Sequence, residues 1–470
     1  MIWFLTRRSI SLGRSRYKDS GSLLQEQRLT FSNWDFGIGM PSKMARKRLL
    51  SRVSVVWLAI GCGLLVAQPA HSAGLFLTEM ATPDLGTAAA GRAALAVDAA
   101  TAFGNPAGMT RLDKSQMLAG IQPAYGITQF DRDSETTISG GNGGNALGFI
   151  PGLAGYYVYS ATPDLKFGIT LGSNFGLSSR YQSNWSGRYY ALQEEILTLS
   201  AFPVAAYRLN NWLSVGAGAQ IIYGKLHSRT GINDALDGGD ASLDVSDHDV
   251  GYGGLAGILI EPIEGTRFGI TYTSQVKLDF KDKPTTNNLG PLLQNALDAS
   301  GLTGARLDIG LTIPNQVMVS AYHDLTDSLA IMGNVVWQQW SEFGKPTVEV
   351  QSTTSNKATA NLNYDDTWGF ALGTRYKFHP EWTWSLGFAF DTSPISTKER
   401  SPALPLDQQI RVGTGIQYAF SDRITLGVAY EYLNLGSADI DRSRPLAGTL
   451  KGDYSTNEIH WFNMTVAWTF

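Results

Sequence analysis

The sequence predicts an all-β protein, a 14-stranded antiparallel transmembrane β-barrel with a small N-terminal hatch. Three observations predict it: the composition, a two-residue alternation of apolar side chains, and breaks that are short and long in turn. Of the 470 residues, 43% are apolar and 17% charged, with 51 glycines, 12 tryptophans and a mean hydropathy of −0.09. A bundle of transmembrane helices needs runs of about 20 apolar residues, so this composition excludes one. It is typical of a sheet with one apolar and one polar face.

The amino terminus carries the marks of an export signal. An apolar stretch, 53–67, follows basic residues at 46–48 and 52 and precedes the small-x-small site Ala70-His71-Ser72. This pattern is typical of a secretory signal peptide. We therefore expect a signal peptide over 44–72, cleaved after Ser72, and interpret residues 1–43 as the product of a mis-assigned start codon. Lipidation at Cys62, the single cysteine, is the alternative.

The chain that follows the signal peptide is acidic. Residues 1–72 hold 11 basic and 3 acidic side chains, so residues 73–470 hold 26 basic and 38 acidic ones. Nucleic acids attract basic surfaces, so this balance argues against a nucleic acid as partner.

Between 73 and 114 the chain is rich in alanine and glycine and includes Asn105-Pro106-Ala107. Such a stretch cannot form a long amphipathic strand. We expect short helices and turns packed as a hatch within the barrel, which spans 115–470. A lumen of about fourteen strands would otherwise leave an aqueous hole.

From about Gln116 onward, apolar residues recur at every second position, the period of a strand with two different faces. The pattern is clear in 267–281 (Phe268 to Phe280 on one face), 368–378, 382–391 and 462–470. The apolar face is aromatic near strand ends, and the other face is small or charged. This favours apolar side chains on lipid and polar ones in a lumen. A soluble β-sandwich is the alternative.

The breaks between these segments alternate in length. We expect fourteen strands, starting near 116, 149, 165, 195, 212, 249, 266, 314, 329, 366, 382, 408, 424 and 458. Short breaks fall at 161–164, 210–211, 262–265, 325–328, 379–381 and 421–422, and long ones at 132–147, 178–194, 231–248, 283–305, 352–365, 396–407 and 442–457. Short turns at one end and long loops at the other are typical of barrels in the Gram-negative outer membrane.

Several segments, taken in order, resemble the FadL/TodX family of outer-membrane transporters for hydrophobic compounds. They are Ala73-Gly74-Leu75-Phe76-Leu77, Asn105-Pro106-Ala107, Ser173-Asn174-Phe175-Gly176-Leu177, Ala206-Tyr207-Arg208-Leu209-Asn210-Asn211, Val276-Lys277-Leu278-Asp279-Phe280-Lys281 and Phe390-Asp391-Thr392-Ser393-Pro394. The set covers nearly all of 73–470. It implies a fourteen-stranded barrel with a hatch, and passive uptake of hydrophobic molecules through an outer groove, an apolar pocket and a gap in the wall.

The resemblance places the gap where the third strand kinks inward, at Gly172-Ser173-Asn174-Phe175-Gly176. Glycine inside a strand marks a bulge or bend, so the residue types fit a local break in pairing. An ordinary glycine-containing strand end is the alternative.

Capture of the ligand is expected on the long loops. Residues 289–302 have the pattern of a short amphipathic helix. Its apolar residues are Leu289, Leu292, Leu293, Ala296 and Leu297. The family's groove lies in the equivalent loop, and packing against a neighbouring loop is the alternative.

Long-chain fatty acids are the first expectation for the ligand, with aromatic hydrocarbons or alkanes as the alternative. A carboxylate needs a cation or several donors, and the candidates expected to face the lumen are Lys277, Arg375 and Arg411. Arg229 lies near the position of the family's carboxylate-binding arginine, but the alternation turns it outward, which weakens the case for a fatty acid. For each basic residue, a lumen salt bridge with partners such as Asp279 or Glu431 is the alternative.

The remaining motifs in the sequence indicate neither catalysis nor metal binding. The sequence lacks Gly-x-Ser-x-Gly, Gly-x-x-x-x-Gly-Lys-Ser/Thr and His-Glu-x-x-His motifs, so we expect no enzyme, catalytic residue, cofactor or metal. The acidic segment 234–249 lacks an EF-hand pattern and is interpreted as a solvated loop that divalent ions could bridge to lipopolysaccharide. A water-filled porin and a barrel hydrolase are the alternatives from other classes. We expect a monomer in the lipid bilayer whose terminal Phe470 serves its assembly by the barrel-assembly machinery.

Overall fold

The computed structural model describes residues 80–470, apart from 235–236, 301, 352–355, 360 and 446. The expected upstream segment 1–43, the signal peptide 44–72 and the first hatch residues 73–79 lie outside the described residues. In the described part of the chain, no helix is long and apolar enough to cross a membrane.

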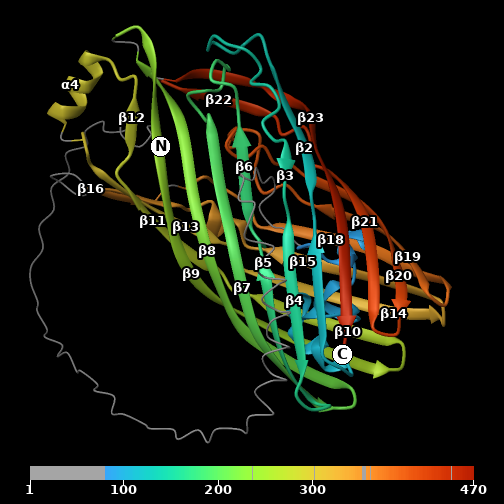
Figure 1. Ribbon diagram of the computed structural model, residues 1–470. Helices are drawn as coiled ribbons and strands as arrows, with labels where there is room; N and C mark the ends of the chain where they lie inside the picture. The colour runs from blue at the N-terminus through green and yellow to red at the C-terminus, as the bar shows by residue number, and fades with distance from the viewer. Residues whose placement is uncertain (1–79, 235–236, 301, 352–355, 360, 446) are drawn as a thin grey trace, which may run out of the picture. The chain divides into compact units, whose positions relative to one another are not determined.

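The described residues form a closed antiparallel barrel of 14 strands, several of which are interrupted (Figure 1). Their order is β1 (Gln116–Ile121) with β2 (Ala124–Arg132), β3 (Phe149–Ile150) with β4 (Leu153–Ser160), β5 (Leu165–Gly172) with β6 (Gly176–Arg180), β7 (Gln193–Asn210), β8 (Leu213–Asp234), β9 (Gly239–Ile263), β10 (Thr266–Thr273) with β11 (Val276–Asp282), β13 (Arg306–Ile313) with β14 (Gln316–Thr326), β15 (Leu329–Gln338), β18 (Thr367–His379), β19 (Trp382–Asp391), β20 (Gln409–Ser421), β21 (Ile424–Asn434) and β23 (Gly448–Thr469).

The last strand closes the barrel. β23 pairs with β21 on one side and with β1 and β2 on the other, for example Ile121 with Met464. The six short breaks that the sequence predicts all join neighbouring antiparallel strands. They lie at the same end of the wall as the carboxyl terminus, and the long connections lie at the opposite end (Figure 1). Because short turns are periplasmic in such barrels, we assign this end to the periplasm.

Burial along the strands is inverted relative to a soluble protein. In β18, Leu372 is 72% exposed, whereas its neighbour Ala371 is 4% exposed. In β19 the large Phe388 is exposed and the small Ala389 is buried. Large apolar side chains therefore face outward and small or polar ones face inward, which confirms the predicted orientation.

Two expected loops are strands instead. The predicted loop 231–248 is the outer part of β8 and β9, paired from Arg229 with Asp244 to Asp234 with Gly239. The predicted loop 442–457 is occupied by β22 (Ile440–Arg444) and the start of β23. Both segments bury a few apolar residues, such as Val245 and Tyr454, but are otherwise rich in glycine, aspartate and serine. These residue types are typical of turns and loops, so the sequence did not indicate strands.

The apolar face changes sides between β10 and β11. Phe268 and Tyr272 of β10 are exposed on the outer face, whereas Val276, Leu278 and Phe280 of β11 are buried. Val276 and Leu278 pack against the inner-face glycines of β8 and β9, and β11 pairs with β13 in a separate sheet that also holds β16 (Thr347–Gln351) and β17 (Asn356–Thr359). The predicted continuous lipid-facing surface is therefore wrong beyond Tyr272, because the chain breaks at 274–275.

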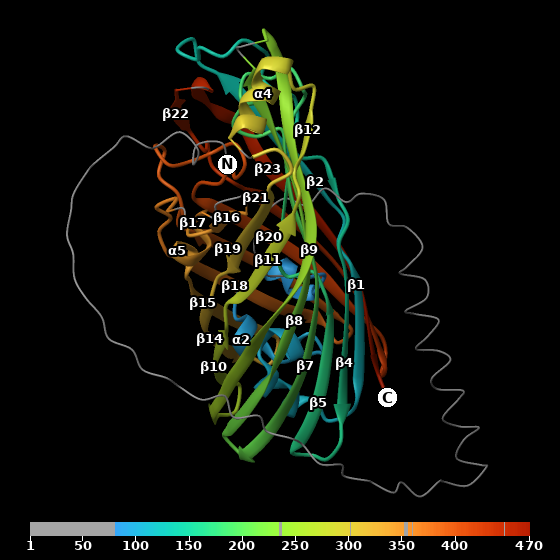
Figure 2. The same cartoon turned by 90° about the vertical axis from the view of Figure 1, so that its left-hand side faces the viewer.

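The alanine-rich segment forms four short helical pieces inside the wall, drawn in blue in the lower half of Figure 2. They are η3 (Pro83–Thr87), α2 (Arg92–Leu95), α3 (Thr101–Gly104) and η4 (Pro106–Arg111). Wall and hatch approach closely because both use small residues. A Cβ atom at Gly269 or Gly387 would overlap the hatch carbonyls of Ala93 and Thr87. The alanine and glycine content thus serves packing of backbone on backbone.

Substituting Phe470 tests whether the terminal aromatic residue serves assembly of the barrel. Its ring stacks on Tyr157 at 6.1 Å, and its N–H donates to the Ser115 carbonyl at 3.0 Å. We expect Phe470→Ser to lower the amount of folded barrel in the outer membrane, measured as the heat-modifiable band on a denaturing gel. Phe420→Ser, at another exposed ring beside a periplasmic turn, should assemble normally. Wild-type amounts of the Phe470→Ser barrel would contradict this role.

Candidate functional site

The third strand path is broken beside β7. Gly172 of β5 pairs with Ser200, and Gly176 of β6 pairs with Leu197, so the strand takes four steps against three on its partner. This is one extra residue, the definition of a β-bulge. No backbone hydrogen bond joins residues 173–179 to β3 or β4. The backbone ladder between the third strand and β4 therefore stops here.

The residues of the break turn into the barrel. Asn174 is buried and its Oδ1 accepts a hydrogen bond from Ser200 Oγ at 2.6 Å, while the Phe175 carbonyl accepts one from Thr198. The Phe175 ring lies 5.9 Å from that of Phe343 in α5 (Trp340–Phe343), which follows β15. The five predicted kink residues thus span the point where pairing with β4 stops and pairing with β7 shifts by one residue.

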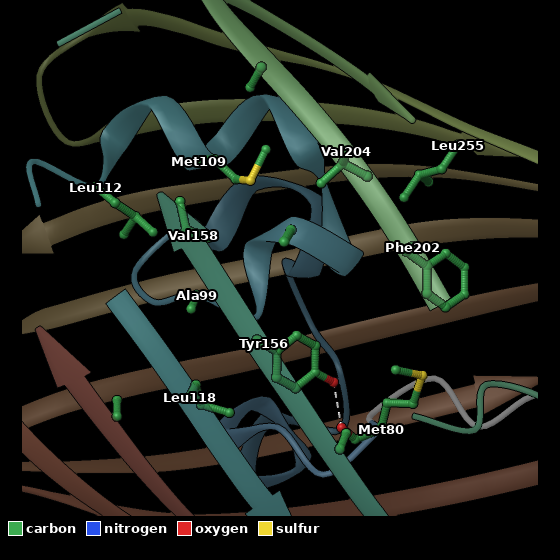
Figure 3. Packing of buried hydrophobic residues seen from close by; sticks show 14 of the residues in the cluster. Met80, Ala99, Met109, Leu112, Leu118, Tyr156, Val158, Phe202, Val204 and Leu255 are labelled. Carbon is green, nitrogen blue, oxygen red and sulfur yellow. Dashed lines mark hydrogen bonds between the residues drawn. The ribbon is translucent and has the colours of Figure 1, made fainter. Parts of the chain in front are cut away.

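The hatch begins beside this break. A Cβ atom at Gly172 would lie 2.9 Å from the Met80 methyl group. Tyr156 donates its hydroxyl to the Met80 carbonyl, a contact drawn as the dashed line in Figure 3. Met80, Met109, Phe202 and Leu255 belong to one apolar cluster that joins hatch and wall (Figure 3). An opening in the wall at this place would therefore lead to the hatch.

The Asn105-Pro106-Ala107 triplet fastens the hatch. Asn105 Nδ2 donates to the carbonyls of Ala93 at 2.7 Å and Ile258 at 2.9 Å, and its Oδ1 accepts from the Ala107 N–H at 3.1 Å. The side chain is fully buried, so each bond is shielded from water. The side-chain amide of Asn105 thus links α2, η4 and β9, and it positions the hatch against the wall.

Charged groups of the hatch line a small cavity of about 30 Å³. Arg92 binds Asp84 at 2.7 Å, and both side chains are buried. The half-buried Asp98 also lines this cavity, and its Oδ1 accepts from the Ala100 N–H at 2.9 Å. Burial, together with the negative charge of Asp84, raises the pKa of Asp98 from 3.8 to about 6.

The raised pKa predicts a pH dependence of the hatch. Between pH 3.8 and about 6 the folded protein holds this proton more tightly than the unfolded chain does. The contribution of this proton to the stability of the folded protein is therefore fully present below pH 3.8 and is lost as the pH rises through about 6. We expect Asp98→Asn to raise the thermal unfolding midpoint above the shifted pKa and to leave it unchanged below the ordinary one. A midpoint that fell above the shifted pKa would contradict this assignment.

The predicted capture segment forms α4 (Pro291–Ala299), at the outer end of the molecule (Figure 1). None of its residues is buried. Leu289, Leu293 and Leu297 are half-buried, Ala296 is exposed and Leu292 is 56% exposed. The Leu292 and Leu293 N–H groups donate to Asp237 at the tip of the β8–β9 hairpin, at 3.0 and 3.2 Å. The hairpin thus holds a helix whose apolar side is still accessible.

The four predicted carboxylate contacts do not converge. Arg229 lies on the outward side of β8 and binds Asp244 at 2.6 Å. Arg375 donates to Gln417 at 2.7 Å, and Arg411 to Asp391 at 3.1 Å. Lys277 is exposed on the face of β11 opposite Val276, and Val276 packs against the inner-face glycines of β9.

The acidic segment 234–249 is not a solvated loop, which corrects the prediction. Its carboxylates are bound within the protein: Asp240 binds Arg188 at 2.8 Å, and Asp247 and Asp249 accept the N–H groups of Lys281 and Asp279 at 2.6 and 2.7 Å. In the described part of the chain, no group of three or more His, Cys, Asp or Glu side chains could hold a metal ion.

Arg400 is a buried cation that no sequence pattern indicated. Arg400, in the expected loop 396–407, donates to the carbonyls of Leu406, Asp439 and Ile395 at 2.8, 2.8 and 2.9 Å. It fixes this loop over the barrel interior. A single arginine in a polar loop carries no pattern that could have revealed it.

The comparisons with known proteins agree with this architecture. Residues 63–470 match the profile of a family described as outer membrane protein transport protein (OMPP1/FadL/TodX). The long-chain fatty acid transport protein of Escherichia coli O6:H1 is 28% identical over 83% of this chain and 92% of its own length. Outer membrane protein P1 of Haemophilus influenzae is 27% identical over 79% and 88%.

Solved structures show the same fold. A FadL homologue of Pseudomonas aeruginosa superimposes with a TM-score of 0.77 at 22% identity, covering 85% of this chain and 100% of the other. The toluene transporter TbuX of Ralstonia pickettii gives a TM-score of 0.61 at 18% identity, covering 84% and 99%.

Proposed function

Because the chain belongs to the OMPP1/FadL/TodX family of outer-membrane transport proteins, we propose that it takes up long-chain fatty acids passively and releases them sideways through the break between β5 and β6. The observation that supports this most directly is that residues 173–179 lack a backbone partner on the β4 side and lie beside the hatch. Continuing the β4–β5 register places the exposed Leu153 opposite Ser173, so the break opens toward a lipid-facing surface.

The path needs no energy input if every step is downhill. Burying a methylene contributes about 0.8 kcal/mol, so accessible leucines on α4 can capture a hydrocarbon chain from water. Between α4 and the hatch, β8 and β11 supply the buried apolar residues Ile222, Leu226 and Leu278. The hatch, proposed to span 73–114 within a barrel of 115–470, blocks the axial route and directs the ligand to the wall.

A neutral hydrocarbon is the second candidate ligand. It is favoured by the scattered basic residues, because Arg229, Arg375 and Arg411 each bind a separate partner. A barrel with this hatch does not resemble a water-filled porin. We also propose that the protein is a monomer, that it contacts lipopolysaccharide and that the barrel-assembly machinery assembles it.

Organic extraction of the purified protein, followed by mass spectrometry, tests the proposed ligand. We expect long-chain fatty acids at a molar ratio near one. Aromatic or aliphatic hydrocarbons in their place would favour the second candidate. Uptake of small sugars by vesicles that contain the protein would contradict both.

A further inference from the structure

A glutamine in the barrel interior has no hydrogen-bond partner. Gln220 of β8 is 1% exposed, and neither its Oε1 nor its Nε2 contacts a donor or acceptor among the described residues. Its neighbours Ile221 and Tyr223 are outward and exposed, so Gln220 faces inward. Buried side-chain amides are almost always hydrogen-bonded in native proteins, so an unpaired one requires an explanation.

The strand register gives this amide its surroundings. Gln220 pairs with Gly253 of β9, and the β7–β8 register places it opposite Phe202. Phe202 in turn pairs with Thr170 of β5, whose hydroxyl is also fully buried and unpartnered. Two unpaired polar groups therefore flank one aromatic ring in a single row across the inner wall.

The row lies between the hatch and the apolar outer interior. Below it, Gly216 touches the hatch at Pro106, and the Phe103 ring of the hatch lies 5.0 Å from that of Phe202. Above it, Gly224 touches Leu278 of β11. A molecule that enters through the apolar interior and stops at the hatch would come to rest at this row.

The wall carries no cation at this level, and Arg92 of the hatch is already bound to Asp84. Within two residues of the row, the inward positions of β4, β5, β7, β8 and β9 hold no lysine or arginine. An ionised carboxylate buried here without a cation would be costly. A side-chain amide offers both donors and an acceptor, which suits a neutral group that also does both, such as a hydroxyl or a protonated carboxyl.

We propose that Gln220, with Thr170 across Phe202, binds the neutral polar head of an otherwise apolar ligand, a hydroxyl or a protonated carboxyl group. This inference rests on the proposed uptake of hydrophobic molecules and narrows its substrate class. It predicts that fatty acids and hydrocarbons bind differently, because only a ligand with a neutral polar head can form hydrogen bonds with Gln220 and Thr170.

Competition binding tests the proposal. Purified full-length protein in lipid nanodiscs is loaded with a fluorescent apolar probe, which is then displaced by decane, 1-decanol or decanoic acid. We expect 1-decanol to bind about tenfold more tightly than decane, the effect of one hydrogen bond. Decanoic acid should share this preference only below its own pKa, which distinguishes an acid from an alcohol as the natural source of the head group.

Variants assign the preference to the amide. Gln220→Leu should abolish the preference for 1-decanol and leave decane binding unchanged, and Thr170→Val should reduce it. Gln417→Leu is the matched control, because Gln417 already binds Arg375 at 2.7 Å, and should keep the full preference. Gln220→Leu should also raise the thermal unfolding midpoint, since it removes an unpaired buried amide.

The outcomes separate the inference from the proposed function. A Gln220→Leu protein that still prefers 1-decanol overturns the inference and leaves the uptake function standing. A lowered unfolding midpoint, with all three ligands weakened alike, also overturns it, because the amide would then be structural. A wild-type protein that releases the probe to none of the ligands overturns both.

Discussion

Deleting Asn174 is expected to reduce ligand uptake to the level of cells that lack the protein. The wall has one residue too many between Gly172 and Gly176, relative to the partner residues Ser200 and Leu197. Removing one residue lets β5 and β6 run on in a single register along β7. The restored strand can then continue its pairing along β4 and β3, which closes the break to the ligand. Uptake of a labelled long-chain fatty acid by a host without its own transporter measures the effect.

Asn174→Ala is the matched control for this deletion. It removes the hydrogen bond from Ser200 but keeps the residue count, so the bulge and the uptake should remain. Heat modifiability shows that both variants are folded barrels. Normal uptake by a folded deletion variant would contradict a route through this break.

Deleting residues 80–112 is expected to convert a tight barrel into an ion-conducting one. The hatch covers polar groups on the inner wall: the Ala93 N–H donates to Ser320 at 3.1 Å, and the Gly91 N–H donates to Asn334 at 2.9 Å. Without the hatch these groups would face water in a lumen wide enough to fill. Single-channel recordings in planar bilayers should show a large ohmic conductance, against little or none for the intact protein.

Val97→Ser controls for a disturbed hatch surface. Val97 is exposed on the hatch, so this change should leave the bilayer tight. A folded deletion variant with unchanged conductance would show that the hatch does not seal the barrel.

The sequence predicted the membrane-embedded part of the fold because lipid imposes a pattern there. Leu372 and Phe388 must face the bilayer while Ala371 and Ala389 face the interior, and this contrast produces the two-residue period. Outside the bilayer, both faces of a strand meet water or protein. The segment around Asp244 is also rich in glycine and aspartate, which are typical of loops, so a hairpin was mistaken for a loop.

The candidate site was less accessible to sequence reasoning. The glycines at 172 and 176 indicated a kink, but the one-residue offset depends on pairing with β7 and cannot be read from one strand. The reversal of faces at 274–275 likewise depends on β11 folding over β8 and β9. Gln220 is one of many polar residues on the inward faces of the strands, so only its lack of hydrogen-bond partners in the structure distinguishes it from the others.

Site-specific photo-crosslinking tests sideways release most directly. A benzophenone amino acid is placed at position 174, in the wall break, or at position 97, on the exposed surface of the hatch near the periplasmic turns. Cells take up an alkyne-tagged long-chain fatty acid and are irradiated. Lateral release predicts that the ligand becomes attached at position 174 and not at position 97. Attachment at position 97 without attachment at position 174 would show that the ligand passes straight through the hatch and would contradict the account.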